Sequence, residues 1–402
     1  VRHPHLGRPE QLRQRSADGS LQQTRYYVYD GHAQLCKTIE PETGATVMHY
    51  DPAGNLDWSA AGLSLSSTLS CDENDASIAA RRVNRGYDTR NRLTTLAFPD
   101  GRGNQAWTYE KDGLPATIAT FNAPGSAAPV VNAYHYNKRR LLDGQGDSVS
   151  QPGWYAWGIG YGYNGNGHLV AQSYPTGLVI DYAPNALGQA TKAGSYATNA
   201  SYFPNGALKQ FTYGNGIVHT LQQNARQLPS RVTSSGGVND FTYNYDHNAN
   251  ITNIWDLGRG NTYSRWMEYD DLDRLTDAGS GSFGGDGWHR FTYDALDNIK
   301  SWKLAGVKDY AEYVYDAQHR LTNIRNTAGA TVVGLDYDLQ GNLSNKNGQV
   351  YTFDYGNRLR SIPGKEIYLY DGLGRRVQSA KADGSSTMLW QYSHSGQMLF
   401  SW

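Results

Sequence analysis

Two glycine-rich strings in the sequence, residues 160–165 and 279–284, have the spacing G-x-G-x-x-G that cradles a pyrophosphate in nucleotide-binding proteins. Such a site needs a strand before the string and a helix that opens within it, because the helix N-terminus holds the phosphate. Neither string opens a helical pattern. We therefore expect no nucleotide cofactor.

Other reactive side chains are present but are not grouped for catalysis. Cys36 could act as a nucleophile with a distant histidine, yet no neighbouring residue orients such a pair. The 11 histidines include no H-E-x-x-H and the two cysteines no C-x-x-C, which argues against zinc. Asp270, Asp271 and Asp273 resemble part of a calcium loop but lack its length and its final glutamate. The sequence predicts no catalytic residue, no metal site and no enzyme activity.

These aspartates belong to a motif that recurs along the whole chain. Its pattern is Tyr-Asp, two free positions, Gly or Asp, Asn or Arg, then Leu or Ile, as in residues 337–343. Between residues 245 and 337 the tyrosines recur every 22 to 24 positions, which indicates a repeat protein. The predicted structural repeat residues are Tyr50, Asp51, Tyr87, Asp88, Tyr245, Asp246, Tyr269, Asp270, Tyr293, Asp294, Tyr315, Asp316, Tyr337, Asp338, Tyr370 and Asp371.

Each copy of the motif is predicted to close a β-hairpin. Aromatic residues two positions apart, such as Tyr243 and Tyr245, place both rings on one face of a strand. The aspartate starts a turn by bonding its own backbone, and the small polar residue three positions later tolerates a left-handed conformation. The following Leu or Ile begins the return strand. The Tyr-Asp pairs are therefore expected to be scaffold rather than chemistry.

Composition favours a thin sheet over a thick apolar core. Apolar residues make up 39% of the chain and the mean hydropathy is −0.64. Roughly 36 strands, at two per repeat, would exceed the usual limit of about ten for an open sheet. We expect one all-β architecture over residues 1–402, in which the hairpin array forms a spiralling sheet around a hollow.

Charge and apolar runs exclude several partners. The net charge is −1 and the pI about 6.9, so no field favours nucleic acid or an anionic membrane. No apolar stretch is long enough to span a bilayer. Residues 57–82 break the repeat and are predicted to be an insertion. Cys36 and Cys71 either form one disulfide or are two small buried residues. Both ends of the chain are expected to be truncated.

The repeat resembles the RHS/YD-repeat family over essentially the whole chain, through the motif copies given above and segments such as residues 213–218. The resemblance implies a β-sheet that spirals into a large hollow shell. In bacterial RHS toxins and Tc-toxin C components such a shell encloses a C-terminal toxin, and teneurins use a related shell in adhesion. The family's Asp-Pro-x-Gly-Leu closing motif is absent, since residues 51–55 end in Asn.

Two functions follow as expectations. The first is a non-enzymatic shell segment of a secreted bacterial toxin, assembled in the cytoplasm, whose partners are a C-terminal toxin cargo, the remaining shell and a delivery machinery. The alternative is a cell-surface adhesin that binds glycans or a partner cell through aromatic strips.

Overall fold

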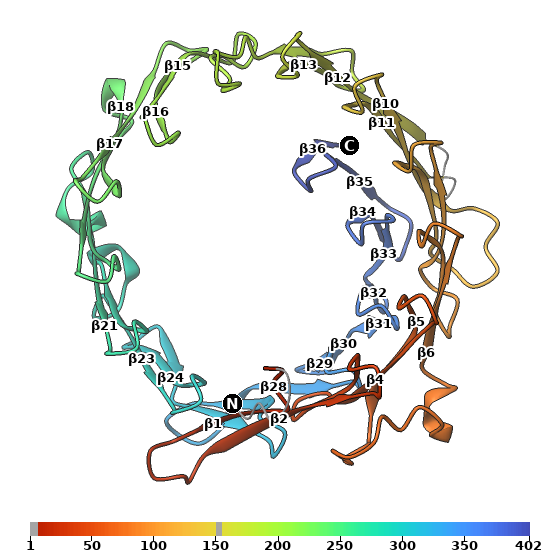
Figure 1. Cartoon of the computed structure of the whole chain (residues 1–402). Helices are drawn as coiled ribbons and strands as arrows, with labels where there is room; N and C mark the ends of the chain where they lie inside the picture. Colours follow the sequence, from red (N-terminus) through yellow and green to blue (C-terminus); the bar gives the residue numbers. More distant parts are fainter. Residues whose placement is uncertain (1–6, 150–154) are drawn as a thin grey trace. The chain divides into compact units, whose positions relative to one another are not determined.

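The computed structural model of the chain describes residues 7–149 and 155–402, and nearly all of their regular structure is antiparallel β-sheet (Figure 1). The strands form four sheets of 14, 11, 5 and 6 strands, each in chain order, so that every strand pairs with its sequence neighbours. The predicted all-β hairpin array is thereby confirmed. Each sheet is open, since its first and last strands do not pair with each other.

The strands have the following bounds. The first sheet holds β1 (Gln11–Arg15), β2 (Gln22–Tyr29), β3 (Leu35–Glu40), β4 (Gly44–Tyr50), β5 (Leu56–Leu63), β6 (Arg82–Tyr87), β7 (Leu93–Ala97), β8 (Asn104–Tyr109), β9 (Pro115–Phe121), β10 (Val130–Tyr136), β11 (Leu142–Val149), β12 (Tyr155–Tyr163), β13 (Leu169–Ser173) and β14 (Val179–Asp181). The second holds β15 (Ala197–Tyr202), β16 (Leu208–Tyr213), β17 (Val218–Gln223), β18 (Pro229–Ser234), β19 (Asn239–Tyr245), β20 (Ile251–Asp256), β21 (Arg265–Tyr269), β22 (Leu275–Gly279), β23 (Trp288–Tyr293), β24 (Ile299–Leu304) and β25 (Lys308–Tyr310).

The two smaller sheets follow in sequence. The third holds β26 (Glu312–Tyr315), β27 (Leu321–Arg325), β28 (Thr331–Tyr337), β29 (Leu343–Lys346) and β30 (Gln349–Val350). The fourth holds β31 (Thr352–Phe353), β32 (Leu359–Ile362), β33 (Glu366–Tyr370), β34 (Arg376–Lys381), β35 (Thr387–Tyr392) and β36 (Met398–Ser401). The helices among the described residues are single 3₁₀ turns, η1 (Ala76–Ile78), η2 (Ser235–Gly237), η3 (Asn261–Tyr263) and η4 (Gly281–Phe283).

The chain divides into two compact units. Unit 1 comprises Val1–Ile159, Tyr315–Asn323 and Val333–Trp402, and unit 2 comprises Gly160–Val314 and Ile324–Val332. Unit 2 contains the whole of the 11-stranded sheet, and η4 lies in the glycine-rich tip between β22 and β23.

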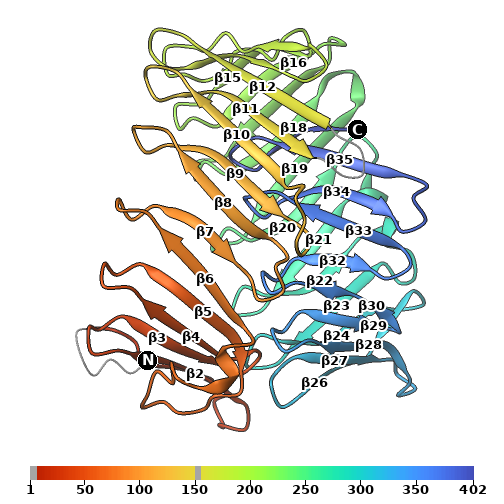
Figure 2. The same ribbon diagram turned by 90° about the vertical axis from the view of Figure 1, so that its right-hand side faces the viewer.

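In unit 1, the last hairpins of the chain form a second layer. Strands β31–β36 lie against strands β8–β12 in both views (Figures 1 and 2). Val377 of β34 packs with Val130 and Val149, and the ring of Phe400 meets the edge of Trp157 at 4.8 Å. A second apolar cluster lies under the predicted insertion, where Ile78 of η1 packs on Ala45, Trp58 and their neighbours.

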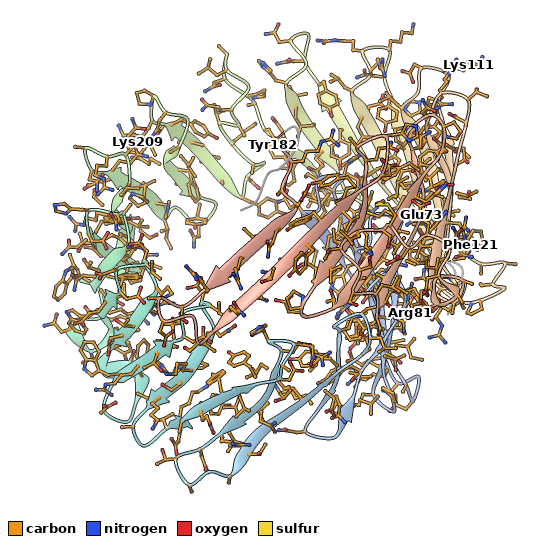
Figure 3. The ribbon with its side chains drawn as sticks, turned by 60° about the horizontal axis from the view of Figure 1, so that its bottom comes forward. Glu73, Arg81, Lys111, Phe121, Tyr182 and Lys209 are labelled. Atoms are coloured by element: carbon orange, nitrogen blue, oxygen red, sulfur yellow. A yellow bond between two sulfur atoms is a disulfide. The ribbon has the colours of Figure 1, made fainter. Side chains whose placement is uncertain are left out.

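The predicted insertion contains both strand and irregular chain. Residues 57–63 continue β5, whereas residues 64–81 form no strand and include η1. The side chains of Glu73 and Arg81 mark the second half of this irregular segment (Figure 3). Cys36 and Cys71 form a disulfide between β3 and this segment, which settles the alternative that the sequence left open.

Candidate functional site

Each Tyr-Asp turn is held by the carboxylate of its aspartate. At Asp88, one carboxylate oxygen accepts hydrogen bonds from the backbone N–H groups of Arg90 (2.8 Å) and Arg92 (3.0 Å). The backbone N–H of Asp88 donates in turn to the carbonyl of Arg92 at 2.9 Å, and Asn91 takes a left-handed φ of 58°. The Arg92 guanidinium, followed by these backbone donors, lowers the pKa of Asp88 to about 2. The carboxylate is therefore ionised throughout the physiological pH range.

The same two backbone hydrogen bonds recur in every copy of the motif that we predicted. They are accepted by Asp51, Asp88, Asp246, Asp270, Asp294, Asp316, Asp338 and Asp371. An asparagine oxygen replaces the carboxylate in further turns, at Asn137, Asn164, Asn185 and Asn224. The last two escaped the sequence analysis because Pro184 and Gln223 stand where the motif has tyrosine. Their weak signal is the residue four positions later, Gln189 or Leu228, whose N–H donates to the asparagine.

The tyrosine of the motif ties its hairpin to the preceding one. The hydroxyl of Tyr293 donates to the carbonyl of Leu275 at 2.8 Å, and Leu275 opens the return strand of the previous hairpin. Tyr50, Tyr87, Tyr245, Tyr269, Tyr337 and Tyr370 make the equivalent bond. Burial raises the pKa of Tyr293, so its hydroxyl keeps the donating proton.

An arginine at the end of several turns links neighbouring repeats. Arg274 pairs with Asp270 of its own turn at 2.7 Å and lies 4.7 Å from the ring centre of Tyr293. It also donates to the carbonyl of Asp294 (3.0 Å) and to the carboxylate of Asp297 (2.8 Å) in the next turn. Arg92, Arg320 and Arg375 repeat the ion pair and the contact with the next tyrosine. These tyrosine and arginine contacts link many neighbouring turns, and together we call them the polar ladder.

A β-bulge accompanies the motif, and the sequence analysis did not predict it. The register shifts where the motif tyrosine enters the turn: Tyr293 pairs with Ile299, whereas Thr292 pairs with Ser301, which leaves Lys300 unpaired. The same shift occurs at Tyr50, Tyr87, Tyr245, Tyr269, Tyr337 and Tyr370. Bulges increase local twist and bend the strand that carries them.

We predict that Tyr293→Phe weakens the ladder. The change removes one hydrogen bond and leaves the carbonyl of Leu275 without that donor, which costs about 1 kcal/mol. Native-state hydrogen exchange of residues 270–300 measures the loss locally. Tyr213→Phe is the matched control, because its side chain is 43% exposed and a surface change shifts stability by less than about 0.5 kcal/mol. Equal protection in Tyr293→Phe and the native chain would show that the hydroxyl is not a tie.

The second feature is a polar seam between the two layers of unit 1. Gly372, in the Tyr370-Asp371 turn, accepts from the Gln105 amide through its carbonyl (2.9 Å) and donates its N–H to the Asn132 side chain (2.8 Å). Asn122 makes the same double contact with the backbone of Tyr370, at 2.9 Å each. Gln145 donates to the carbonyl of Tyr392 in the next turn. The buried amides of Gln105, Asn132 and Gln145, and the half-buried amide of Asn122 just after β9, therefore bind the backbone of the turns that cover them.

Glycine is required where the turn meets the sheet. A Cβ atom on Gly372 would lie 2.3 Å from a methyl carbon of Ile118, closer than any real contact. Gly103, with a φ of +82°, meets the Arg358 guanidinium in the same way. Arg358 and Arg360 are buried with Asp354, which is fully enclosed and pairs with Arg360 at 2.5 Å. The seam therefore depends on glycine backbone lying close to side chains of the facing layer, and on polar contacts between the layers.

A buried carboxyl lies inside this seam. The side chain of Asp147, on β11, accepts from the Asn132 amide at 2.5 Å, while the same amide nitrogen lies 3.5 Å from Asp371. Burial, and then the charge of Asp371, raise the pKa of Asp147 to about 6, against the opposing effects of Asn132 and Arg375. Asp371 itself is paired with Arg375 at 2.6 Å.

We predict that Asp147 makes unit 1 less stable as the pH rises from about 4 to about 6. The folded pKa lies above the value of 3.8 taken for an unperturbed aspartate, so the folded state holds the proton longer and is favoured at the acidic end. The whole contribution to the free energy of unfolding is about 3 kcal/mol, of which about 2 kcal/mol is lost between pH 4 and pH 6. Urea titrations from pH 4 to 7.5 test this. Asp147→Asn should remove the slope, whereas Asp383→Asn, in an exposed hairpin tip, should leave it. An unchanged slope in Asp147→Asn would contradict the assignment.

The residues first considered for chemistry have structural roles. The two glycine-rich strings lie in β12 with its turn and in β22 with η4, and neither opens an α-helix. Cys36 is in a disulfide and offers no thiol. Asp270 pairs with Arg274, and Asp273 accepts from Asn250 at 2.7 Å. Within residues 7–149 and 155–402, no three His, Cys, Asp or Glu side chains gather as a metal site would require.

Unit 2 carries a row of aromatic side chains. Phe291 stacks on Trp302 (5.5 Å between ring centres), and Trp302 meets Tyr310 edge-on at 6.0 Å. The Lys308 ammonium lies 3.6 Å from the ring centre of Trp302. Much of each ring face contacts another ring or Lys308. The rings therefore form an uneven apolar surface rather than a flat platform.

Comparison with known proteins identifies the repeat. Residues 287–400 match the family model described as Teneurin YD-shell. This part of the chain, which includes strands β23 to β35, is similar to a teneurin YD shell. No curated protein matches it in sequence.

Solved Tc-toxin structures share the fold of this chain. A mutant Tc holotoxin pore of Photorhabdus luminescens aligns with 94% of this chain, with a TM-score of 0.57 and 15% identity. The TcdB2-TccC3-Cdc42 crystal structure aligns with 96% (TM-score 0.59, 14% identity), and TcdB2-TccC3 without its hypervariable C-terminal region with 94% (0.58, 14%). The chain spans only 21% to 23% of the length of those chains. Among residues 7–149 and 155–402, no helix is long and apolar enough to cross a membrane.

Proposed function

We propose that this chain is a wall segment of a secreted, toxin-like shell protein and that the complete wall encloses a cargo following it in the same polypeptide. The observation that carries the proposal is the polar ladder of Tyr-Asp turns. The ladder lets a single-layered sheet grow by one hairpin after another without a thick apolar core, and such a sheet is suited to enclosing space. The likeness to TcdB2-TccC3, a protein with a hypervariable C-terminal region, supports it.

The role is structural rather than catalytic. The polar groups that could do chemistry are engaged within the turns and the seam, as for Asp270 with Arg274 and Asp371 with Arg375. The proposed partners are the C-terminal cargo, the rest of the shell and a delivery machinery. The proposed location is outside the producing bacterium after assembly in its cytoplasm. The residues of the Tyr-Asp motif act in this proposal as the structural repeat.

The enclosure proposal predicts that the longer natural protein protects its own C-terminal extension from an added protease. Gly372→Asp should breach the wall, because a side chain at that position collides with Ile118 at the seam. The extension should then be digested at least tenfold faster. Gly158→Ala is the control, since no atom lies within 4 Å of the added carbon. Rapid digestion of the extension in the native protein, with the wall intact, would refute enclosure.

A second candidate is adhesion through the aromatic row of Phe291, Trp302 and Tyr310, which the family-model match to teneurin shells also supports. The ring faces that a sugar would need are largely used within the row. If adhesion is the function, a glycan array should give reproducible hits that Trp302→Ala abolishes and Trp107→Ala does not. An array without hits counts against this candidate.

A further inference from the structure

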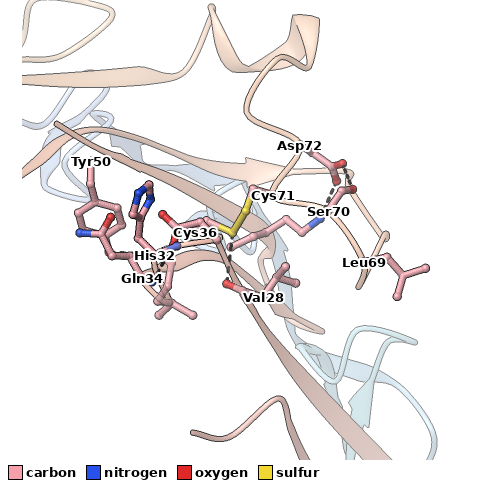
Figure 4. The surroundings of a disulfide bond; sticks show 12 residues. Val28, His32, Gln34, Cys36, Tyr50, Leu69, Ser70, Cys71 and Asp72 are labelled. Carbon is pink, nitrogen blue, oxygen red and sulfur yellow. Dashed lines mark hydrogen bonds and ion pairs between the residues drawn. A yellow bond between two sulfur atoms is a disulfide. The ribbon is translucent and has the colours of Figure 1, made fainter. Parts of the chain in front are cut away.

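The disulfide joins a fully buried position to a surface segment. Cys36 lies in β3 with no exposed surface, and Cys71 follows 35 residues later in the irregular segment between β5 and β6. Cys71 is half-buried. The bond is drawn with its neighbours in Figure 4, where Cys71, Ser70 and Asp72 lie along one loop above β3.

Few other contacts hold the segment of residues 64–75, which contains neither strand nor helix. Asp72 receives the Lys37 ammonium at 2.6 Å, and the Lys37 side chain is fully buried. Leu65 packs partly on the apolar cluster of β4 and β5, whereas Leu69 is 94% exposed. The disulfide and the Lys37–Asp72 ion pair are adjacent, so they fasten the segment at one point.

A solvent molecule or reductant can contact Cys71 directly. Cys36 is fully buried and has no such contact. A surface pocket is lined by Cys71 together with Ser70, Asn74 and the end of β2, and Cys36 does not line it. Four carboxylates border the same pocket: Asp30, Asp72, Glu73 and Asp75. A thiolate that enters the pocket therefore meets Cys71 first. On the way it passes Asp30, Glu73 and Asp75, whereas the charge of Asp72 is offset by Lys37.

We propose that Cys36–Cys71 is a reducible fastener for residues 64–75 and that the acidic pocket selects which thiols open it. The thiolate of a dithiol attacks the Cys71 sulfur, the S–S bond breaks, and the electron pair leaves on the Cys36 sulfur, which takes up a proton. The second thiol of the reductant then attacks the mixed disulfide and releases Cys71. The dithiol ends as its cyclic disulfide, two electrons having passed to the protein, and residues 64–75 come free of β3.

The charge of the pocket predicts a preference among reductants. Glutathione carries a net negative charge, which becomes larger when its thiol ionises, so the carboxylates of Asp30, Glu73 and Asp75 repel it. Dithiothreitol is uncharged before ionisation and is repelled less. Salt screens such repulsion over about 8–10 Å. This proposal concerns the thiol chemistry of the segment and does not depend on whether the wall encloses a cargo.

The first experiment measures opening of the disulfide in the folded chain by alkylation of new thiols and mass spectrometry. Glutathione should open it more slowly than dithiothreitol at equal thiolate concentration, and 0.5 M salt should narrow the difference. Glu73→Gln should speed the glutathione reaction at least twofold and the dithiothreitol reaction by a smaller factor. Equal acceleration of both reductants by Glu73→Gln, or no reaction with either without denaturant, would overturn the proposal.

The second experiment tests the release of the segment. Brief thermolysin digestion should cut within residues 64–75 at least tenfold faster in the reduced chain and in Cys71→Ser than in the oxidised chain. Cleavage at the exposed tip around Leu339, which is 68% exposed, is the internal control and should not change. If Cys71→Ser folds, as cleavage elsewhere at native rates would show, and its segment stays as resistant as in the oxidised chain, the disulfide is not a fastener.

Discussion

A sheet one layer thick cannot place its polar backbone ends beneath a broad apolar core, so each hairpin must satisfy its own turn. The carboxylate of each motif aspartate does so by accepting two backbone N–H groups that would otherwise be left without partners. Tyr293 and Arg274 then carry the same hydrogen bonding to the adjacent repeat. The stability of the array therefore rests on many short-range polar contacts, with small apolar clusters such as that of Val130, Val149 and Val377 added where two layers meet.

The seam in unit 1 uses the same chemistry between layers. Asn122 and Asn132 offer side-chain amides to the backbone of Tyr370 and Gly372, much as a neighbouring strand would offer its peptide groups. The Tyr-Asp turn is compact and glycine-containing, so it can approach the face of a sheet closely enough to be bound there. One motif thus serves both as the turn of its own hairpin and as the contact point of the second layer. Burial of Asp147 in this seam raises the pKa of its carboxyl to about 6.

The hairpins could be predicted because their determinants lie within a few residues of one another, as in Tyr269, Asp270 and Arg274. The bulge was not predicted because the motif specifies only the residue that opens the return strand. Nothing in the motif indicates that the residue after it, such as Lys300, is unpaired. The seam could not be predicted locally, since Asn132 and Gly372 are 240 positions apart and neither belongs to a pattern that names the other. The pairing of Cys36 with Cys71 was left open for the same reason, as it depends on the path of an irregular segment.

The separation of the seam contacts in sequence has a consequence for how the chain folds. Ladder contacts such as that of Tyr293 with Leu275 close loops of 18 residues, whereas Gln105 and Gly372 close one of 267. Short loops form early and long ones late, because loop closure costs more entropy as the loop grows. During synthesis, strands β8–β11 therefore emerge and pair first. At that stage the side-chain amides that will later be buried in the seam are still exposed to water. The covering layer can dock only after its own hairpins have been synthesised, so its contacts with β8–β11 form later than those within each hairpin.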